Sequence, residues 1–134
     1  MKYFIEMLEN NNVVRKGAPL NSKDIILTQK ELTAKGYPCL PVAFLDFLKI
    51  YNGVAALDSA ILGIGNSISE DVASFNALYN HFEGQTILGY DDFAFLVYDA
   101  PKDKYFLLSQ ADGSEIDDFN QDEFVSALNS IIHI

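Results

Sequence analysis

The segment from Leu40 to Gly53 constrains the fold more than any other part of the chain. Pro41 is typical of the first position of a helix, where its missing N–H has no partner to lose, and Asn52-Gly53 is typical of the left-handed residues that end one. Between these marks lies one apolar face at helical spacing, made of Phe44, Phe47, Leu48 and Tyr51. A face with three aromatic rings must be buried, so the sequence predicts a helix that packs into a core.

Length and composition predict one folded domain. A chain of 134 residues with 49% apolar and 13% aromatic content is long enough to bury a core and unlike a disordered segment. We expect a single domain over residues 1–134, with an N-terminal helix and connector over 1–23 and the core over 24–134. No apolar run is long enough to cross a membrane, and no signal sequence is recognisable, so the expected location is the cytoplasm. The single cysteine, Cys39, is predicted to be a buried structural thiol.

Three further helices are predicted from apolar spacing and from the residues that end them. The first covers the N-terminal residues up to Asn10, and residues 13–20 follow it as a connector. The second covers about residues 24–35, and Gly36 ends it. The third has an apolar face from Val72 to Phe82, and Gly84 ends it.

From Thr86 the helical period gives way to extended runs. Residues 86–90, 93–98 and 105–110 are rich in β-branched and aromatic side chains, and turn residues separate them. Residues 115–118 add a short acidic strand, and the apolar runs 54–57 and 61–65 predict two more short strands. Asn120 and Glu123 form a capping box before a last helix that lies on the sheet. The sequence therefore predicts an α+β fold with an antiparallel meander.

The charge is unevenly distributed along the chain. Residues 1–50 carry a net charge of +2, whereas residues 51–134 hold fourteen acidic groups against Lys102 and Lys104. Such a surface repels nucleic acid and anionic lipid, so neither nucleic acid nor membrane is an expected partner. It attracts a basic macromolecule, although an acidic surface also simply keeps a protein soluble.

Several of these residues together resemble the SUKH superfamily, which includes the Smi/Knr-type fungal cell-wall regulators and many bacterial proteins. The resemblance spans roughly residues 24–132 and lies in Leu40-Pro41, Phe44, Phe47-Leu48, Asn52-Gly53, Leu88-Gly89, Asp91, Phe119 and Phe124. It implies a twisted, mainly antiparallel sheet with helices packed on one side. For bacterial members it also implies a non-enzymatic role without a cofactor, as immunity proteins that bind and neutralise toxins, often nucleases or deaminases.

The acidic second part of the chain is compatible with that role. Nuclease toxins tend to be basic because they hold phosphates, so an acidic inhibitor is attracted to the surface it must block. The predicted partner-binding residues are acids at turns and strand ends, which are not needed for packing. They are Asp91, Asp92, Asp99, Asp103, Asp112, Glu115, Asp117 and Asp118.

Three other interpretations stay open at this point. In the first, the acids form a solvated face that binds no partner. In the second, they hold a metal ion in a hydrolase, although the residue spacing of a calcium-binding loop is missing. In the third, the chain is a small-molecule or peptide sensor whose ligand lies on the concave face of the sheet. That pocket is expected to be lined by Tyr90, Phe95 and Tyr105.

Overall fold

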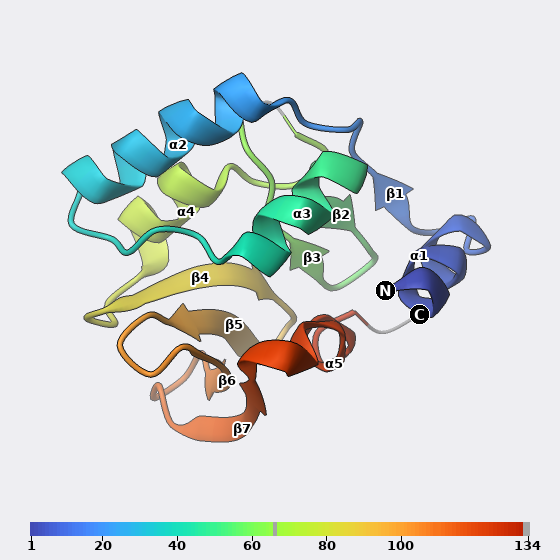
Figure 1. The fold of residues 1–134 in the computed structure, drawn as a ribbon. Helices are drawn as coiled ribbons and strands as arrows, with labels where there is room; N and C mark the ends of the chain where they lie inside the picture. The colour runs from blue at the N-terminus through green and yellow to red at the C-terminus, as the bar shows by residue number, and fades with distance from the viewer. Residues whose placement is uncertain (66, 133–134) are drawn as a thin grey trace.

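The computed structural model describes residues 1–65 and 67–132 and shows an antiparallel sheet with helices around it (Figure 1). Each strand of this described part pairs with its neighbours in sequence, in the order β1-β2-β3-β4-β5-β6-β7. The prediction of an α+β fold with a mainly antiparallel meander is therefore confirmed. In chain order the elements are α1 (Lys2–Glu9), β1 (Arg15–Lys16), α2 (Ser22–Ala34), α3 (Val42–Ile50), β2 (Val54–Ala55), β3 (Ala60–Ile61), α4 (Val72–Tyr79), β4 (Gln85–Tyr90), β5 (Ala94–Asp99), β6 (Lys104–Ser109), β7 (Glu115–Asn120), the 3-10 helix η1 (Gln121–Glu123) and α5 (Phe124–Asn129).

The long strands lie where the sequence predicts them. β4, β5 and β6 differ from the predicted runs by no more than one residue at either end. β7 continues from the predicted end at Asp118 to Asn120. The one strand not predicted is β1, because two charged residues, Arg15 and Lys16, carry no strand pattern; they pair with Ala55 and Val54 of β2.

α3 provides the apolar face predicted from its sequence. The helix begins after Pro41, which has extended backbone at the N-cap, and the side chains of Phe44, Phe47 and Leu48 are fully buried. α1 packs against this face, since the rings of Phe4 and Phe47 lie 6.0 Å apart. The aromatic helix face is therefore the place where the N-terminal helix joins the core.

The end of α3 differs from the prediction. Gly53 has a left-handed φ of 88°, but Asn52 does not share that conformation. The Asn52 side chain points inward instead: its Nδ2 donates to the carbonyl of Ile64 at 2.9 Å, and its Oδ1 accepts from the Ile64 N–H at 2.7 Å. The helix has already ended at Ile50, since Tyr51 has extended backbone, so Gly53 turns the chain beyond the helix and Asn52 holds the segment after β3.

α4 is shorter than predicted. It begins at Asp71, whose carboxylate accepts from the Ser74 N–H at 3.0 Å, and it ends at Tyr79, three residues before Phe82. Asn80 turns the chain there, because its side chain accepts from the Phe82 N–H and donates to the carbonyl of Gln85 at the start of β4. Side-chain hydrogen bonds of this kind to nearby backbone groups replace the backbone hydrogen bonds that would continue the helix.

Cys39 is exposed, so the prediction of a buried thiol is wrong. It lies in the segment between α2 and α3, where the next residue, Leu40, is buried. Successive side chains of an extended segment point to opposite sides, and here the inward position belongs to the leucine. The Cys39 Sγ lies 3.9 Å from Thr33 Oγ1 at the end of α2.

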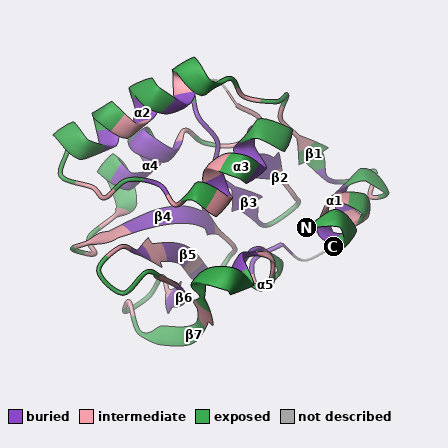
Figure 2. Cartoon of the chain, in the orientation of Figure 1, coloured by how far each residue is buried: buried purple, intermediate pink, exposed green. Residues whose placement is uncertain are grey.

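Burial divides the sheet into a covered part and an exposed edge. β4, β5 and β6 are largely buried, whereas five of the six residues of the edge strand β7 are exposed (Figure 2). On one face of the sheet the ring of Tyr105 lies 5.4 Å from Phe124 of α5. None of the described helices, of which α2 is the longest, has both the length and the apolarity to cross a membrane.

Asn76 of α4 completes the buried edge of β4. β3 pairs only with the end of β4, at Gly89 and Tyr90. Beyond that point the backbone of Ile87 bonds to Asn76, whose Nδ2 donates to the Ile87 carbonyl at 3.0 Å and whose Oδ1 accepts from the Ile87 N–H at 2.7 Å. Asn76 is fully buried, so its amide replaces a missing strand where water cannot.

We predict that Asn76→Ala lowers the free energy of unfolding by about 2–4 kcal/mol, because two buried backbone groups lose their partner. Asn129→Ala, at an exposed position of α5, is the control and changes it by less than about 0.5 kcal/mol. Urea denaturation of both variants measures the difference. Equal stability of the two would show that Asn76 does not support the β4 edge.

Candidate partner-binding surface

The predicted acids lie along the part of the sheet from β4 to β7. Asp91 and Asp92 occupy the turn between β4 and β5, and Asp99 and Asp103 flank the turn between β5 and β6. The other four lie in or after the turn between β6 and β7, namely Asp112, Glu115, Asp117 and Asp118. The first and third turns share one end of the sheet, where Gln110 Nε2 donates to the carbonyl of Asp91 at 2.6 Å.

Asp99 is buried, so the expectation that it is an exposed acid at a turn is wrong. Its carboxylate accepts from the Lys102 N–H at 3.0 Å and from Gln85 Nε2 at 2.9 Å. Asp99 therefore closes the turn after β5 and links it to the paired residue on β4. A turn position alone does not show whether a carboxylate points outward to solvent or inward to backbone donors.

The acids at the other turns are held by local hydrogen bonds. Asp91 is partly buried and accepts from the N–H groups of Phe93 and Ala94. Asp112 is exposed and accepts from the N–H and hydroxyl of Ser114, which lowers the pKa of its carboxyl group. These bonds fix the direction of the Asp91 and Asp112 carboxylates, and the side chains of Asp92 and Asp112 are exposed.

β7 presents its acids on an open edge. Glu115, Asp117 and Asp118 are all exposed, and Asp118 pairs with Lys104 Nζ at 2.9 Å. Lys104 also lies 5.7 Å from the centre of the Phe106 ring. An exposed pair of this kind contributes little to stability, but it partly neutralises Asp118; a second lysine, Lys102, lies 5.2 Å from the centre of the same Phe106 ring.

Two acids that the sequence did not assign to the surface extend it. Asp122 and Glu123 in η1 directly follow β7 and are exposed; their position at a helix start suggested capping alone. The Glu123 carboxylate does accept from the Asn120 N–H at 2.9 Å, which confirms the predicted capping box. Acids that immediately follow an acidic edge strand were the available signal of a shared surface.

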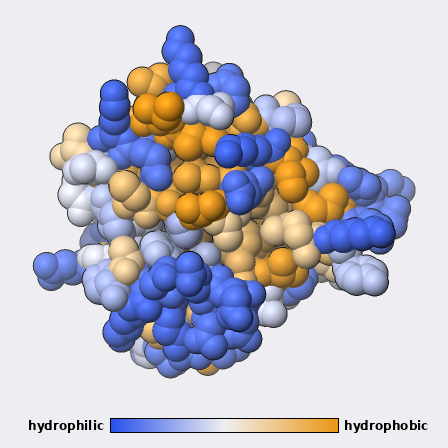
Figure 3. Space-filling view, viewed as in Figure 1, coloured by the Kyte–Doolittle hydropathy of each residue, from blue (hydrophilic) through white to orange (hydrophobic). Residues whose placement is uncertain are grey.

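We call the exposed acids of residues 103–123 the acidic face. Within this range Lys104 is the only basic residue, and the printed sequence has no lysine or arginine after it. Figure 3 shows hydrophilic side chains gathered over β7 and the adjoining end of the molecule. The members of the acidic face are Asp103, Asp112, Glu115, Asp117, Asp118, Asp122 and Glu123.

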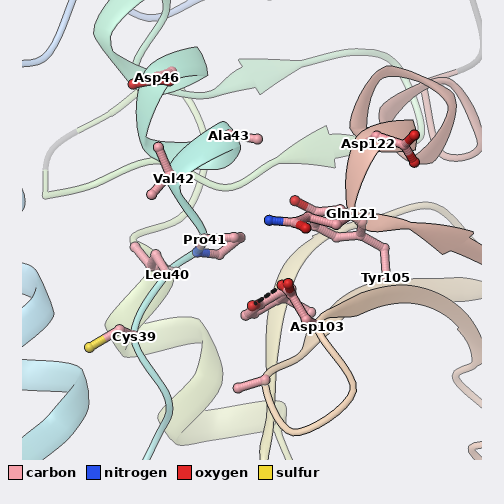
Figure 4. Close-up of a pocket in the computed structure, with 12 residues that line it drawn as sticks. Cys39, Leu40, Pro41, Val42, Ala43, Asp46, Asp103, Tyr105, Gln121 and Asp122 are labelled. Carbon is pink, nitrogen blue, oxygen red and sulfur yellow. Dashed lines mark hydrogen bonds between the residues drawn. The ribbon is translucent and has the colours of Figure 1, made fainter.

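A cleft of about 670 Å³ borders the acidic face. Figure 4 shows the start of α3, with Pro41 and Ala43, on one side of the cleft and Gln121 and Asp122 of η1 on the other. Asp103 lies below them on the turn between β5 and β6. The cleft therefore has an apolar wall from α3 and a polar wall that belongs to the acidic face.

Two tyrosines connect this cleft to the sheet. Tyr98 and Tyr105 are paired across β5 and β6, with ring centres 5.5 Å apart. The Tyr98 hydroxyl donates to Asp103 at 2.6 Å, the bond drawn as a dashed line in Figure 4. Burial, this hydrogen bond and the carboxylate charge together raise the pKa of Tyr98 to about 12. Asp103 has a φ of 51°, a left-handed conformation that aspartate tolerates better than most residues.

The pocket expected from Tyr90, Phe95 and Tyr105 does not form. Phe95 pairs with Leu108, three residues from Tyr105 on the same strand, so Phe95 and Tyr105 lie on opposite faces of the sheet. Phe75 of α4 covers the other two rings, stacked on Tyr90 at 5.3 Å and edge-on to Phe95 at 6.1 Å. Tyr105 alone of the three lines the cleft.

Within residues 1–65 and 67–132, no three His, Cys, Asp or Glu side chains are grouped as metal ligands. Comparison with known proteins adds no assignment: no protein-family model matches the chain, and the curated proteins contain no significant match.

We predict that Asp99→Ala lowers the free energy of unfolding by about 1–3 kcal/mol, because the Lys102 N–H and the Gln85 amide lose a buried acceptor. Asp92→Ala is the control, since Asp92 is exposed, and it changes stability by less than about 0.5 kcal/mol. Thermal or urea unfolding of both variants distinguishes the two acids. A neutral Asp99→Ala would contradict the structural role of this carboxylate.

We predict that Tyr98 weakens the fold at high pH. The unfolded chain releases the Tyr98 proton near pH 10, whereas the folded chain keeps it to about pH 12, so stability falls as the pH rises between these values. Tyr98→Phe removes this loss, and unfolding measured between pH 8 and 12 tests it. Tyr3→Phe, at an exposed site, is the control; a curve identical to that of Tyr98→Phe would contradict the prediction.

Proposed function

We propose that this chain is a SUKH-type immunity protein, which binds a basic toxin domain of the nuclease or deaminase class and neutralises it without catalysis. The observation that carries the proposal is the acidic face, seven exposed carboxylates along the open β7 edge, the adjoining turns and η1, with Lys102 and Lys104 as neighbouring lysines. The family resemblance of the sequence gives the proposal its biological class. The binding role is the part that charge and geometry support.

The position of the acids favours binding to a protein. They lie on an edge strand, two turns and η1, whereas most aromatic residues of the helices are packed in the core. A surface of one sign attracts an oppositely charged protein from solution and orients it before contact. About 800 Å² on each partner is enough for a stable complex, and a strand with its neighbouring turns is of that scale.

The deciding experiment is neutralisation in cells. Bacterial immunity genes lie beside the genes of their toxins, so the C-terminal domain encoded immediately upstream is expressed alone and together with this chain. We expect the domain to arrest growth when alone and growth to return when this chain is present. An upstream domain that arrests growth whether or not this chain is present would contradict the proposal, as would an upstream gene without a toxic domain.

The role of the acidic face is tested with charge reversals. We predict that Asp117→Lys combined with Asp122→Lys slows association with that domain about tenfold at low salt, because both changes remove electrostatic attraction. Glu6→Lys combined with Asp58→Lys is the matched control, since both acids are exposed, lie outside the acidic face and give the same change in net charge. Stopped-flow or surface-binding kinetics at two salt concentrations measures the difference. Equal rates for the two double variants would remove the acidic face from the interface.

A further inference from the structure

The most informative residue of the cleft is Tyr105. Its side chain is only 1% exposed, yet it lines the cleft, and its hydroxyl has no hydrogen-bond partner among the described residues. Among the described residues only Ser59 Oγ is a fully enclosed side-chain polar atom without a partner, so the Tyr105 hydroxyl oxygen is open to the cleft. Burial raises the pKa of Tyr105, so the hydroxyl keeps its proton at neutral pH. This hydroxyl is a polar group directed at whatever occupies the cleft.

The groups around Tyr105 define the chemistry of that occupant. Asp103 and Asp122 carry negative charge into the cleft from two different elements, and Gln121 adds an amide between them. Asp46 lies on the α3 side, with a weak contact of 3.8 Å to Lys49. No lysine or arginine is among the described residues that line the cleft. The site is therefore built for a cation with several hydrogen-bond donors.

We propose that the cleft binds the guanidinium group of an arginine side chain presented by the partner. This proposal rests on the proposed function, and it makes the cleft the part of the acidic face that recognises a particular side chain. The guanidinium donates to Asp103 and Asp122, and the Tyr105 hydroxyl accepts from it. Leu40, Pro41 and Ala43 form the apolar wall for the methylene groups of the arginine.

The geometry favours arginine over lysine for two reasons. The acceptors come from separate elements, the turn before β6 and the 3-10 helix η1, and a planar group with five donors offers hydrogen bonds in several directions at once. Guanidinium also stacks on aromatic rings, and Tyr98 and Tyr105 both line the cleft. A cleft of about 670 Å³ has room for a whole arginine side chain.

The experiment uses small probes and the full chain, so it does not depend on the toxin. N-acetyl-arginine amide, its lysine counterpart and the uncharged citrulline counterpart are titrated while NMR follows the backbone amides. We expect saturable binding of the arginine probe with a Kd on the order of 1 mM, with shifts at Asp103, Tyr105 and Gln121. Citrulline is expected to bind at least about tenfold more weakly, and lysine to fall between them. Equal binding of citrulline, no saturation, or shifts confined to other residues would overturn the proposal.

Two variants separate ligand binding from structure. Tyr105→Phe keeps the buried ring and should raise the Kd of the arginine probe about fivefold. It should not lower the melting temperature, because the lost hydroxyl bonds nothing in the described protein. Asp122→Asn should raise the Kd of the probe about threefold, whereas Asp92→Asn, outside the cleft, should leave it unchanged. Unchanged affinity of both cleft variants would overturn the proposal.

The same variants separate this proposal from the proposed function. If the toxin is neutralised and Tyr105→Phe and Asp122→Asn bind it as tightly as the wild type, the arginine pocket is wrong while the immunity role stands. If the arginine probe binds in the cleft but no neighbouring toxin is neutralised, the pocket stands and the immunity role is wrong.

Discussion

The fold depends on two buried asparagine side chains that bond backbone groups where no strand does so. β3 is two residues long, so most of the β4 edge has no strand beside it. Asn76 of α4 bonds both backbone groups of Ile87 on that edge, and Asn52 after α3 does the same for Ile64 after β3. Both asparagines are buried, where an unpaired amide or carbonyl would be costly. Through these bonds the helices and the sheet fix each other's positions.

This arrangement leaves the other edge of the sheet open. β7 is covered by no helix along most of its length, and its residues are exposed apart from the partly buried Phe119. An open strand edge invites pairing with another sheet, and charges of one sign oppose it. The acids of β7 therefore oppose self-association of the isolated protein, and in the proposed complex they attract the partner. The partner would meet a surface already kept free of self-association by the same charges.

Much of the architecture follows from local patterns in the sequence. The strands β4 to β6 have β-branched and aromatic residues bounded by turn chemistry, and the capping box at Asn120 and Glu123 lies where its spacing predicts. The errors occur where a polar or small side chain had two possible directions. Asp99 and Cys39 are the two examples. The acid expected at the surface is buried against hydrogen-bond donors, and the thiol expected in the core is exposed. Their directions depend on neighbours distant in sequence.

By itself the sequence determined the α+β class, the meander and the concentration of acids in the second part of the chain. These follow from periodicity, turn residues and charge, which are properties of short segments. Only the tertiary structure decided which acids share a surface and which residues line the cleft. Strand register places Tyr98 beside Tyr105 and puts Phe95 on the opposite face, and the positions of α3 and η1 on the two sides of the cleft set its width. Register and packing join segments far apart in the chain, and no local pattern encodes the distance between them.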